Sequence, residues 1–256
     1  MDLTKENILI TGAAGRIGSS IARIAFNYGA KIIINDINEK NLNYLFEELS
    51  LKDSSRVYAF HDDITNPKGI EELIKKSIKK VGVITSAVHS AYPRSKQWGT
   101  KFEDIKFEYL EKDLSMQLGS AIIFSQKILE VFKEQMNGQL IHISSIQGLG
   151  APKFEHYEDT DMNSPIEYTA IKSGVIAISK WLAKYYKNKG IRINCVSPGG
   201  ILDNQPKVFI DRYKKSCNNI GMLSSDNIAN TVIFLLSSES AAISGQNIIV
   251  DDGWSL

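Results

Sequence analysis

The chain has 256 residues, of which 43% are hydrophobic, and its 30 basic and 29 acidic side chains leave a formal net charge of +1. This composition supports a large buried core and argues against nucleic acid or a membrane surface as a partner. The two cysteines, Cys195 and Cys217, are too few for a disulfide framework and favour a reducing compartment. Since no secretory signal and no apolar run of bilayer length is found, the sequence predicts a cytoplasmic protein.

Short apolar runs rich in β-branched residues recur along the chain and alternate with segments of helical spacing. The runs expected to form strands are 7–11, 31–35, 56–60, 86–90, 139–144, 191–196 and 246–250. In the first helical segment, Ile17, Ile21 and Ile24 share one face. Apolar strands that alternate with helices form a parallel sheet covered on both faces. We therefore predict an α/β fold, with a single-domain doubly wound parallel sheet (Rossmann fold) over residues 1–256 and ligand at the carboxyl ends of the strands.

The segment TGAAGRIG follows the first predicted strand and opens the first predicted helix. Gly12 permits a tight turn, Gly18 permits close packing of the helix, and the helix N-terminus offers amide donors to a pyrophosphate. A bare strand-to-helix turn would also explain these glycines. However, Asp36 ends the second apolar run, 18 residues after Gly18, where a carboxylate meets the adenosine ribose of a dinucleotide. The pattern therefore predicts a dinucleotide-binding site.

Two charged side chains near this site bear on the choice of cofactor. The Asp36 carboxylate accepts hydrogen bonds from the two ribose hydroxyls of NAD, and it repels the 2′-phosphate of NADP. Arg16 favours NADP instead, because its guanidinium either pairs with that phosphate or neutralises the charge of Asp36. We expect NAD as the cofactor and keep NADP as the alternative.

A tyrosine and a lysine lie one helical turn apart in YTAIK, downstream of a predicted strand that ends in HISS. A phenol titrates near about 10 in water, and an ammonium group one turn away stabilises the phenolate. We therefore predict Tyr168 as proton donor and acceptor, with Lys172 as its electrostatic partner and as a ligand of the nicotinamide ribose. The same spacing starts at Tyr185, but that residue lies too near the next strand, and we interpret it as a packing aromatic.

From end to end the chain resembles the short-chain dehydrogenase/reductase family. The motifs that carry the resemblance are TGAAGRIG, HDDI (61–64), VGVITSAVHSAY (81–92), HISS (142–145), YTAIK (168–172), NCVSPGGI (194–201) and VDDG (250–253). HSAYPRS and KFEHYEDTDM narrow the resemblance to bacterial flagellin-modification and sugar-pathway oxidoreductases. The resemblance implies an NAD(P)-dependent enzyme that moves hydride between nicotinamide C4 and a hydroxyl or carbonyl carbon of a sugar or sugar-derived small molecule, in a flagellin glycan-precursor pathway.

The resemblance also implies roles for individual residues. Ser145, rather than Ser144, polarises the substrate carbonyl. Asp63 and Ile64 hold the adenine, and the backbone near Ile201 binds the carboxamide of the nicotinamide. The full set of implied cofactor-binding residues is Gly12, Arg16, Ile17, Gly18, Asp36, Asp63, Ile64, His89, Ala91, Tyr168, Lys172, Pro198, Gly199 and Ile201.

Two departures from the family pattern leave a second interpretation open. The family's Asn-Asn-Ala-Gly after the fourth strand reads HSAY at 89–92, so His89 or Ser90 must replace the hydrogen bonds that steady the central sheet. Gln117 stands where the family has an asparagine that holds a proton-relaying water, and we keep Gln117 as a catalytic candidate. The alternative function is a non-catalytic dinucleotide-binding scaffold or regulatory subunit.

The loops bear on the substrate. The segment 146–167 is longer than is usual in the family and mixes aromatic with acidic residues, while 92–104 contains Arg94 and Lys96. Aromatic faces among polar groups suit a polyhydroxylated ligand, and the two basic side chains are candidates for binding a phosphate or carboxylate. Solvated loops or subunit contacts are the alternative interpretation of both segments.

Further expectations concern a lid, the assembly and metals. The resemblance implies a mobile substrate lid near 203–222. It also implies a homodimer or homotetramer that pairs two long helices, expected at 103–134 and 165–188. The four histidines are scattered without ligand spacing, so we expect no metal site.

Overall fold

Seven parallel strands form one sheet in the computed structural model, which describes residues 1–256. The strands are β1 (Asn7–Thr11), β2 (Lys31–Asn35), β3 (Val57–Phe60), β4 (Ser86–His89), β5 (Gly138–Ile143), β6 (Ile191–Pro198) and β7 (Asn247–Val250). Their order across the sheet is β3-β2-β1-β4-β5-β6-β7, and all neighbours pair in parallel. The predicted doubly wound α/β fold is confirmed, because every strand lies within two residues of its predicted range.

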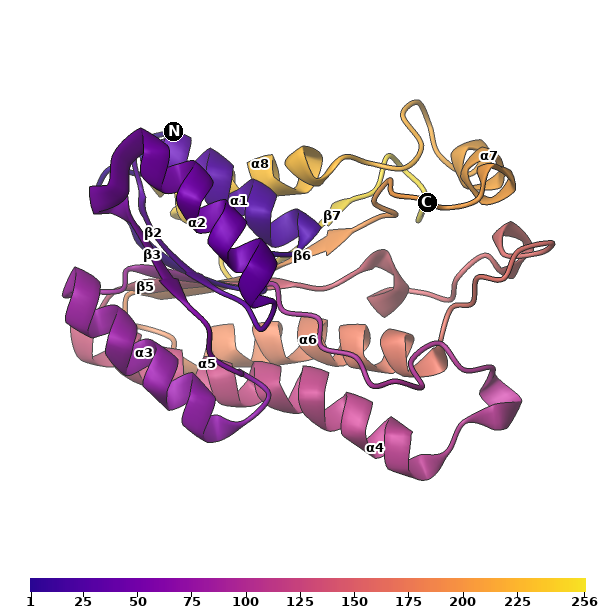
Figure 1. The fold of residues 1–256 in the computed structure, drawn as a ribbon, viewed down its shortest axis with the longest axis horizontal. Helices are drawn as coiled ribbons and strands as arrows, with labels where there is room; N and C mark the ends of the chain where they lie inside the picture. Colours follow the sequence, from indigo (N-terminus) through magenta and orange to yellow (C-terminus); the bar gives the residue numbers. More distant parts are fainter.

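Helices cover both faces of the sheet (Figure 1). One face carries α1 (Arg16–Asn27), α2 (Glu39–Asp53) and α8 (Ser225–Leu236), and the other carries α3 (Pro67–Val81), α5 (Ser120–Gln135) and α6 (Ile166–Tyr185). Side chains of β1 alternate between the two cores: Ile8 and Ile10 pack with α1 and α8, and Leu9 packs with α3 and α5. Burial on both faces explains the continuous apolar character of the strands. None of the helices combines the length and hydropathy that a bilayer crossing requires.

The region predicted as one helix over 103–134 contains a break that the apolar spacing does not reveal. A short 3₁₀ turn (Phe102–Asp104) precedes α4 (Phe107–Leu114), and a π-helical turn at Ser115–Gly119 joins α4 to α5. The Ser120 hydroxyl donates to the carbonyl of Met116, a side-chain bond that competes with the regular helical pattern. Such π turns occur frequently at functional sites, and this one places Gln117 in the interior.

The turn between β1 and α1 depends on two glycines. Gly12 has a φ of +66°, and a Cβ there would lie 2.6 Å from Cα of Ala91. A Cβ on Gly18 would overlap the Gly12 carbonyl and lie 2.9 Å from Cα of Ala13. Only residues without a side chain permit the helix to approach the strand this closely.

We therefore expect Gly18→Ala to destabilise the protein by about 1–3 kcal/mol, because the methyl group meets backbone atoms that cannot move aside without distorting the turn. Thermal unfolding of the purified variant measures the effect. Gly150→Ala is the control, since Gly150 is exposed and a Cβ there meets no atom within 4 Å. Equal melting temperatures for the two variants would contradict the tight packing at Gly18.

Candidate active site

Two cavities lie where the carboxyl ends of the strands meet the loops. The larger, of about 540 Å³, is lined by segments that follow β1, β2, β3 and β4. The smaller, of about 240 Å³, is lined by segments that follow β5 and β6, by α7 (Lys207–Lys215) and by a residue of the C-terminal segment. The strand order reverses between β1 and β4, the position at which open α/β sheets bind their ligands.

The larger cavity has the features that an adenosine diphosphate group requires. Gly12 and Gly15 line it, and no side chain caps the N-terminus of α1, so the first amides of the helix are free to donate to phosphate. Asp36 lines it from the end of β2. The Asp36 carboxylate accepts hydrogen bonds from the backbone amides of Ala14 and Asn38, both at 2.9 Å. These two bonds orient the carboxylate at the end of the strand. These residues fit a dinucleotide.

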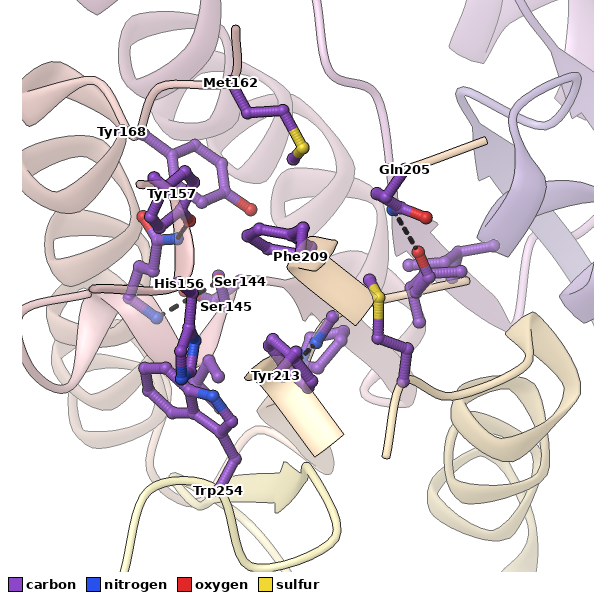
Figure 2. A pocket seen from close by; sticks show the side chains of 18 residues that line it. Ser144, Ser145, His156, Tyr157, Met162, Tyr168, Gln205, Phe209, Tyr213 and Trp254 are labelled. Carbon is purple, nitrogen blue, oxygen red and sulfur yellow. Dashed lines mark hydrogen bonds between the residues drawn. The ribbon is translucent and has the colours of Figure 1, made fainter. Parts of the chain in front are cut away.

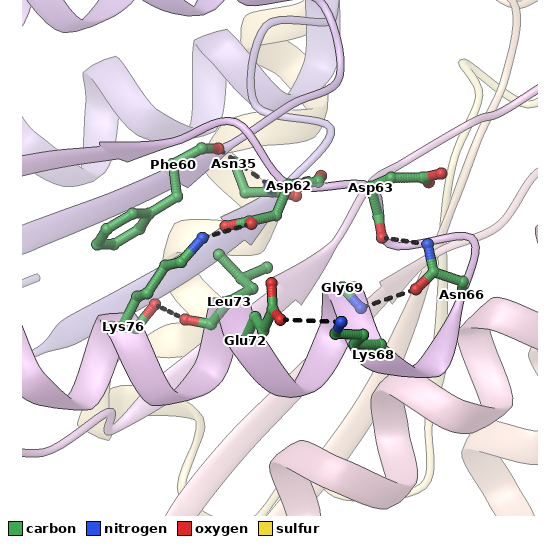
Figure 3. A network of polar contacts seen from close by, with 11 residues as sticks. Asn35, Phe60, Asp62, Asp63, Asn66, Lys68, Gly69, Glu72, Leu73 and Lys76 are labelled. Carbon is green, nitrogen blue, oxygen red and sulfur yellow. Dashed lines mark hydrogen bonds and ion pairs between the residues drawn. The ribbon is translucent and has the colours of Figure 1, made fainter.

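The loop between β3 and α3 also lines this cavity, and its polar contacts are shown in Figure 3. Asp63 and Ile64 both line the cavity, as expected for residues that contact adenine. The Asp63 carboxylate accepts the amide of Thr65 at 2.8 Å, and Asn66 caps α3 by accepting the amide of Gly69 at 2.8 Å. The loop is therefore held by its own hydrogen bonds before any ligand is present.

Arg16 does not pair with Asp36, one of the two partners considered from the sequence. Its guanidinium forms an ion pair with Asp203, at the start of the segment predicted as a lid. Ile17, the next residue, lines the smaller cavity, whereas Gly18 lines neither cavity and serves the packing of α1. The N-cap Gly15 and the first turn of α1 thus contact the two cavities and Asp203.

His89 lies inside the protein and lines neither cavity. Its Nδ1 lies 2.9 Å from the Thr11 hydroxyl, and its ring stacks on Phe124 at 5.0 Å. Burial lowers the pKa of His89 well below its usual value, so the ring is neutral. His89 therefore ties β4 to β1, while the following residues, Ser90 and Ala91, face the larger cavity.

Ser145 and Tyr168 meet in the smaller cavity (Figure 2). Ser144, at the end of β5, donates to the carbonyl of Lys172 at 2.8 Å and so holds the strand end against α6. The Lys172 ammonium donates to the carbonyl of Ile143 at 3.0 Å and lies 5.6 Å from the centre of the Tyr168 ring. A phenol, an alcohol and an ammonium group are thus gathered at one strand end.

Burial governs the protonation of this group. It raises the pKa of Tyr168, an effect that hydrogen bonding with Ser145 opposes. Burial also lowers the pKa of Lys172 to about 8. The other tyrosine with the same spacing, Tyr185, is exposed and stacks on Trp181 at 4.8 Å, away from both cavities.

Gln117 is buried in the π turn, and its Nε2 has no hydrogen-bond acceptor. It lines neither cavity, although the preceding residue, Met116, lines the larger one. A buried amide donor without an acceptor is costly, and a bound water or a change of conformation must satisfy it. Gln117 is therefore one of several buried polar groups without a partner; two others, Asn35 and Asp62, belong to residues that line the larger cavity.

The segment after β6 forms the floor of the smaller cavity. Pro198, Gly199 and Ile201 all line it. The amide of Gly200 donates to the Tyr213 hydroxyl at 2.6 Å, which joins this floor to α7.

Sequence reasoning missed most of the aromatic wall of this cavity. Phe209 and Tyr213 of α7 contribute to it, as do Met222 and Trp254. The sequence around 203–222 was interpreted as a lid without naming these rings, and Trp254 follows the last strand in a segment without periodicity. The signal in the sequence that could have indicated this wall is the presence of aromatic residues soon after the glycine-rich ends of the strands.

Comparison with known proteins gives consistent results over the whole chain. A family model described as enoyl-(acyl carrier protein) reductase matches residues 12–255. The chain is 39% identical to post-translational flagellin modification protein A of Campylobacter coli, over 99% of this chain and 100% of that protein. It is 29% identical to the 7α-hydroxysteroid dehydrogenase of Bacteroides fragilis, over 96% of this chain and 93% of that protein.

Solved structures agree with this result. A short-chain dehydrogenase of Leptospira borgpetersenii with bound NAD⁺ matches with a TM-score of 0.88 at 29% identity, covering 100% of this chain and 94% of that one. The fold and the site therefore define an oxidoreductase that uses a nicotinamide cofactor. The chain belongs to the short-chain dehydrogenase/reductase family, which confirms the resemblance seen in its sequence.

Proposed function

We propose that this protein transfers hydride between C4 of NAD and a hydroxyl or carbonyl carbon of a sugar or sugar-derived compound in a flagellin glycan-precursor pathway. The meeting of Ser145 and Tyr168 in one cavity carries the proposal. Full-length similarity to a flagellin modification protein supports the pathway. When bound, the cofactor supplies or accepts the hydride, and the side chains of this protein handle the oxygen and its proton.

Each member of the catalytic group has a separate task. The Ser145 hydroxyl donates to the substrate oxygen and stabilises the negative charge that develops there. Tyr168 gives its phenolic proton to that oxygen in reduction and takes it back in oxidation. The charge of Lys172 stabilises the phenolate, which brings the pKa of the phenol closer to neutrality.

An assay of the purified protein with NAD against free, phosphorylated and nucleotide-linked sugars tests the function. Turnover of a member of this panel is the expected result. Binding of NAD without turnover of any hydroxyl or carbonyl compound would favour a non-catalytic scaffold or regulatory subunit, the alternative that Gln117 and the HSAY segment leave open.

We expect NAD to be preferred over NADP, because the Asp36 carboxylate lies in the larger cavity and Arg16 is engaged by Asp203. Asp36→Asn should narrow the ratio of kcat/KM for NAD over NADP by about tenfold, or about 1.4 kcal/mol, since it removes the repulsion of the 2′-phosphate. Glu39→Gln, which removes a charge from the first turn of α2 outside the cavity, is the control. A native preference for NADP would overturn this part of the proposal.

Gln117 is proposed as a catalytic residue that replaces the family asparagine through a bound water. We expect Gln117→Leu to lower kcat by about 10²-fold without weakening NAD binding, because the amide that would hold the water is lost. Gln117→Asn should retain most of the activity. Gln126→Leu, a matched change at an exposed position of α5, should have no effect. Unchanged kcat in Gln117→Leu would leave this residue a structural role only.

The remaining proposals concern assembly, lid and location. We propose a homodimer or homotetramer formed through α5 and α6, on which Ile122 and Trp181 are exposed, with 45% and 61% of their surface accessible. Other apolar residues of these two helices, such as Phe124, Ile128 and Ile176, are buried in the core. The segment 203–222 is proposed as the substrate lid, and the cytoplasm, where the cofactor is supplied, as the location.

A further inference from the structure

The smaller cavity contains no side chain that carries a full charge at neutral pH. Its lining includes no lysine, arginine, aspartate or glutamate. Its polar side chains are the hydroxyls of Ser144 and Ser145, the amides of Gln147 and Gln205, three phenols, one imidazole and the indole of Trp254. Building on the function proposed above, we propose that the substrate is uncharged around its reacting carbon. It is a neutral hydroxy or carbonyl compound held by aromatic rings and hydrogen bonds, not by ion pairs.

The basic residues that the sequence offered as anion anchors lie elsewhere. Arg94 lines the larger cavity, where its guanidinium lies 5.2 Å from the centre of the Tyr92 ring, and Lys96 lines neither cavity. An anion that enters the smaller cavity therefore meets no cationic side chain in its lining; the buried ammonium of Lys172 is not part of that lining and donates to the Ile143 carbonyl. Transfer of an unpaired charge from water into such a site is strongly unfavourable.

Two basic residues of the surrounding segments are engaged in contacts of their own. Arg212 of α7 pairs with Asp159 at 2.7 Å, which joins the lid segment to the long loop after β5. Lys153 donates to the carbonyl of Trp254 at 3.1 Å, with its ammonium 4.7 Å from the centre of the indole ring. These contacts hold the segments around the cavity in place, and the charged groups of Arg212 and Lys153 are not part of the cavity lining.

The wall presents aromatic rings and neutral donors and acceptors (Figure 2). Tyr157 packs against Phe209 at 5.1 Å, and Tyr213 stacks on Trp254 at 5.7 Å. Buried His156 packs between α7 and Trp254, with its Nε2 3.0 Å from the Ser216 hydroxyl. Burial lowers the pKa of His156, so the imidazole is neutral at pH 7 and serves as donor and acceptor. Such a wall suits a saturated ring, which offers C–H faces to the aromatic rings and hydroxyls to the polar groups.

The size of the cavity agrees with this chemistry. At about 240 Å³ the cavity has less than half the volume of the larger one, which measures about 540 Å³. The nicotinamide is expected beside Pro198, Gly199 and Ile201, so only part of this volume is left for the substrate. A nucleotide linked to the substrate would have to lie outside the wall.

The test measures kcat/KM at saturating NAD for matched pairs, each a neutral hexose or cyclitol and its monophosphate or uronic acid. We expect the neutral member of each pair to be favoured at least about tenfold. Preference for the anionic member, with turnover still dependent on Tyr168, would overturn the inference and leave the oxidoreductase function intact. Bound NAD with no turnover of any compound would overturn the proposed function and the inference with it.

A second experiment introduces a charged side chain into the lining of the smaller cavity. Gln205 lines the wall, whereas Asn204, one residue earlier, is exposed and does not. Gln205→Lys should shift the preference toward the anionic members by about tenfold, and Asn204→Lys should leave it unchanged within about twofold. An equal shift in both variants, or none in Gln205→Lys, would overturn the role of the uncharged lining.

Discussion

Tyr168→Phe is expected to lower kcat by about 10²–10⁴-fold, the range that a positioned acid or base contributes. The change removes only the phenolic oxygen and keeps the ring contacts with Tyr92 at 5.6 Å and Trp98 at 6.0 Å. Because the fold and the larger cavity are unaffected, the affinity for NAD should change by less than about twofold. Steady-state kinetics with the substrate found in the panel, and calorimetric titration with NAD, measure the two quantities.

Tyr185→Phe is the matched control, because Tyr185 also precedes a lysine by four residues and lies on an exposed surface. It should keep full activity. Activity retained in Tyr168→Phe, or lost equally in both variants, would contradict the assignment of proton transfer to Tyr168.

Lys172→Met is expected to remove most of the activity and yet to stabilise the folded protein. Lys172 is 8% exposed, and burial lowers its pKa from 10.5 to about 8, which corresponds to about 3 kcal/mol against the folded state below pH 8. Loss of the hydrogen bond to the Ile143 carbonyl offsets about 1 kcal/mol of the gain. The net gain of about 2 kcal/mol should raise the melting temperature by about 4–8 °C at pH 7 without cofactor.

The pH dependence of this gain in stability shows whether it comes from removing a buried charge or from better packing of the methionine side chain. Below pH 8 the lysine is charged in both states, and the full penalty acts on the native protein. Between pH 8 and 10.5 the folded state releases its proton first, so the penalty declines and the advantage of methionine shrinks. Lys180→Met, at an exposed position of α6, should change neither stability nor activity. A gain that stays constant from pH 7 to 10.5 would refute burial of a charge as its cause.

The strands were predicted well from the sequence for a physical reason. Ile33 and Leu9 are fully buried, as are most residues of the central strands, because helices cover both faces of the sheet. Local composition therefore reports tertiary burial directly. The glycine turn, Asp36 and the tyrosine-lysine pair were also recognisable, since their spacing is local.

Features that depend on distant partners were not predictable in this way. The sequence places Arg16 near Asp36, but the guanidinium pairs with Asp203 from another part of the chain. The π turn follows from the hydrogen-bond register around Ser120, which leaves no trace in apolar spacing. The aromatic wall combines α7 with Trp254, two segments that only the folded sheet brings together.

Tyr213 joins two parts of the site through one side chain. Its ring lines the smaller cavity, while its hydroxyl accepts a hydrogen bond from the amide of Gly200, in the segment that follows β6. A ligand that displaces the ring therefore also acts on that segment. Where one ligand contacts the ring and another contacts the segment, each should change the affinity for the other by the same factor, whichever of the two binds first.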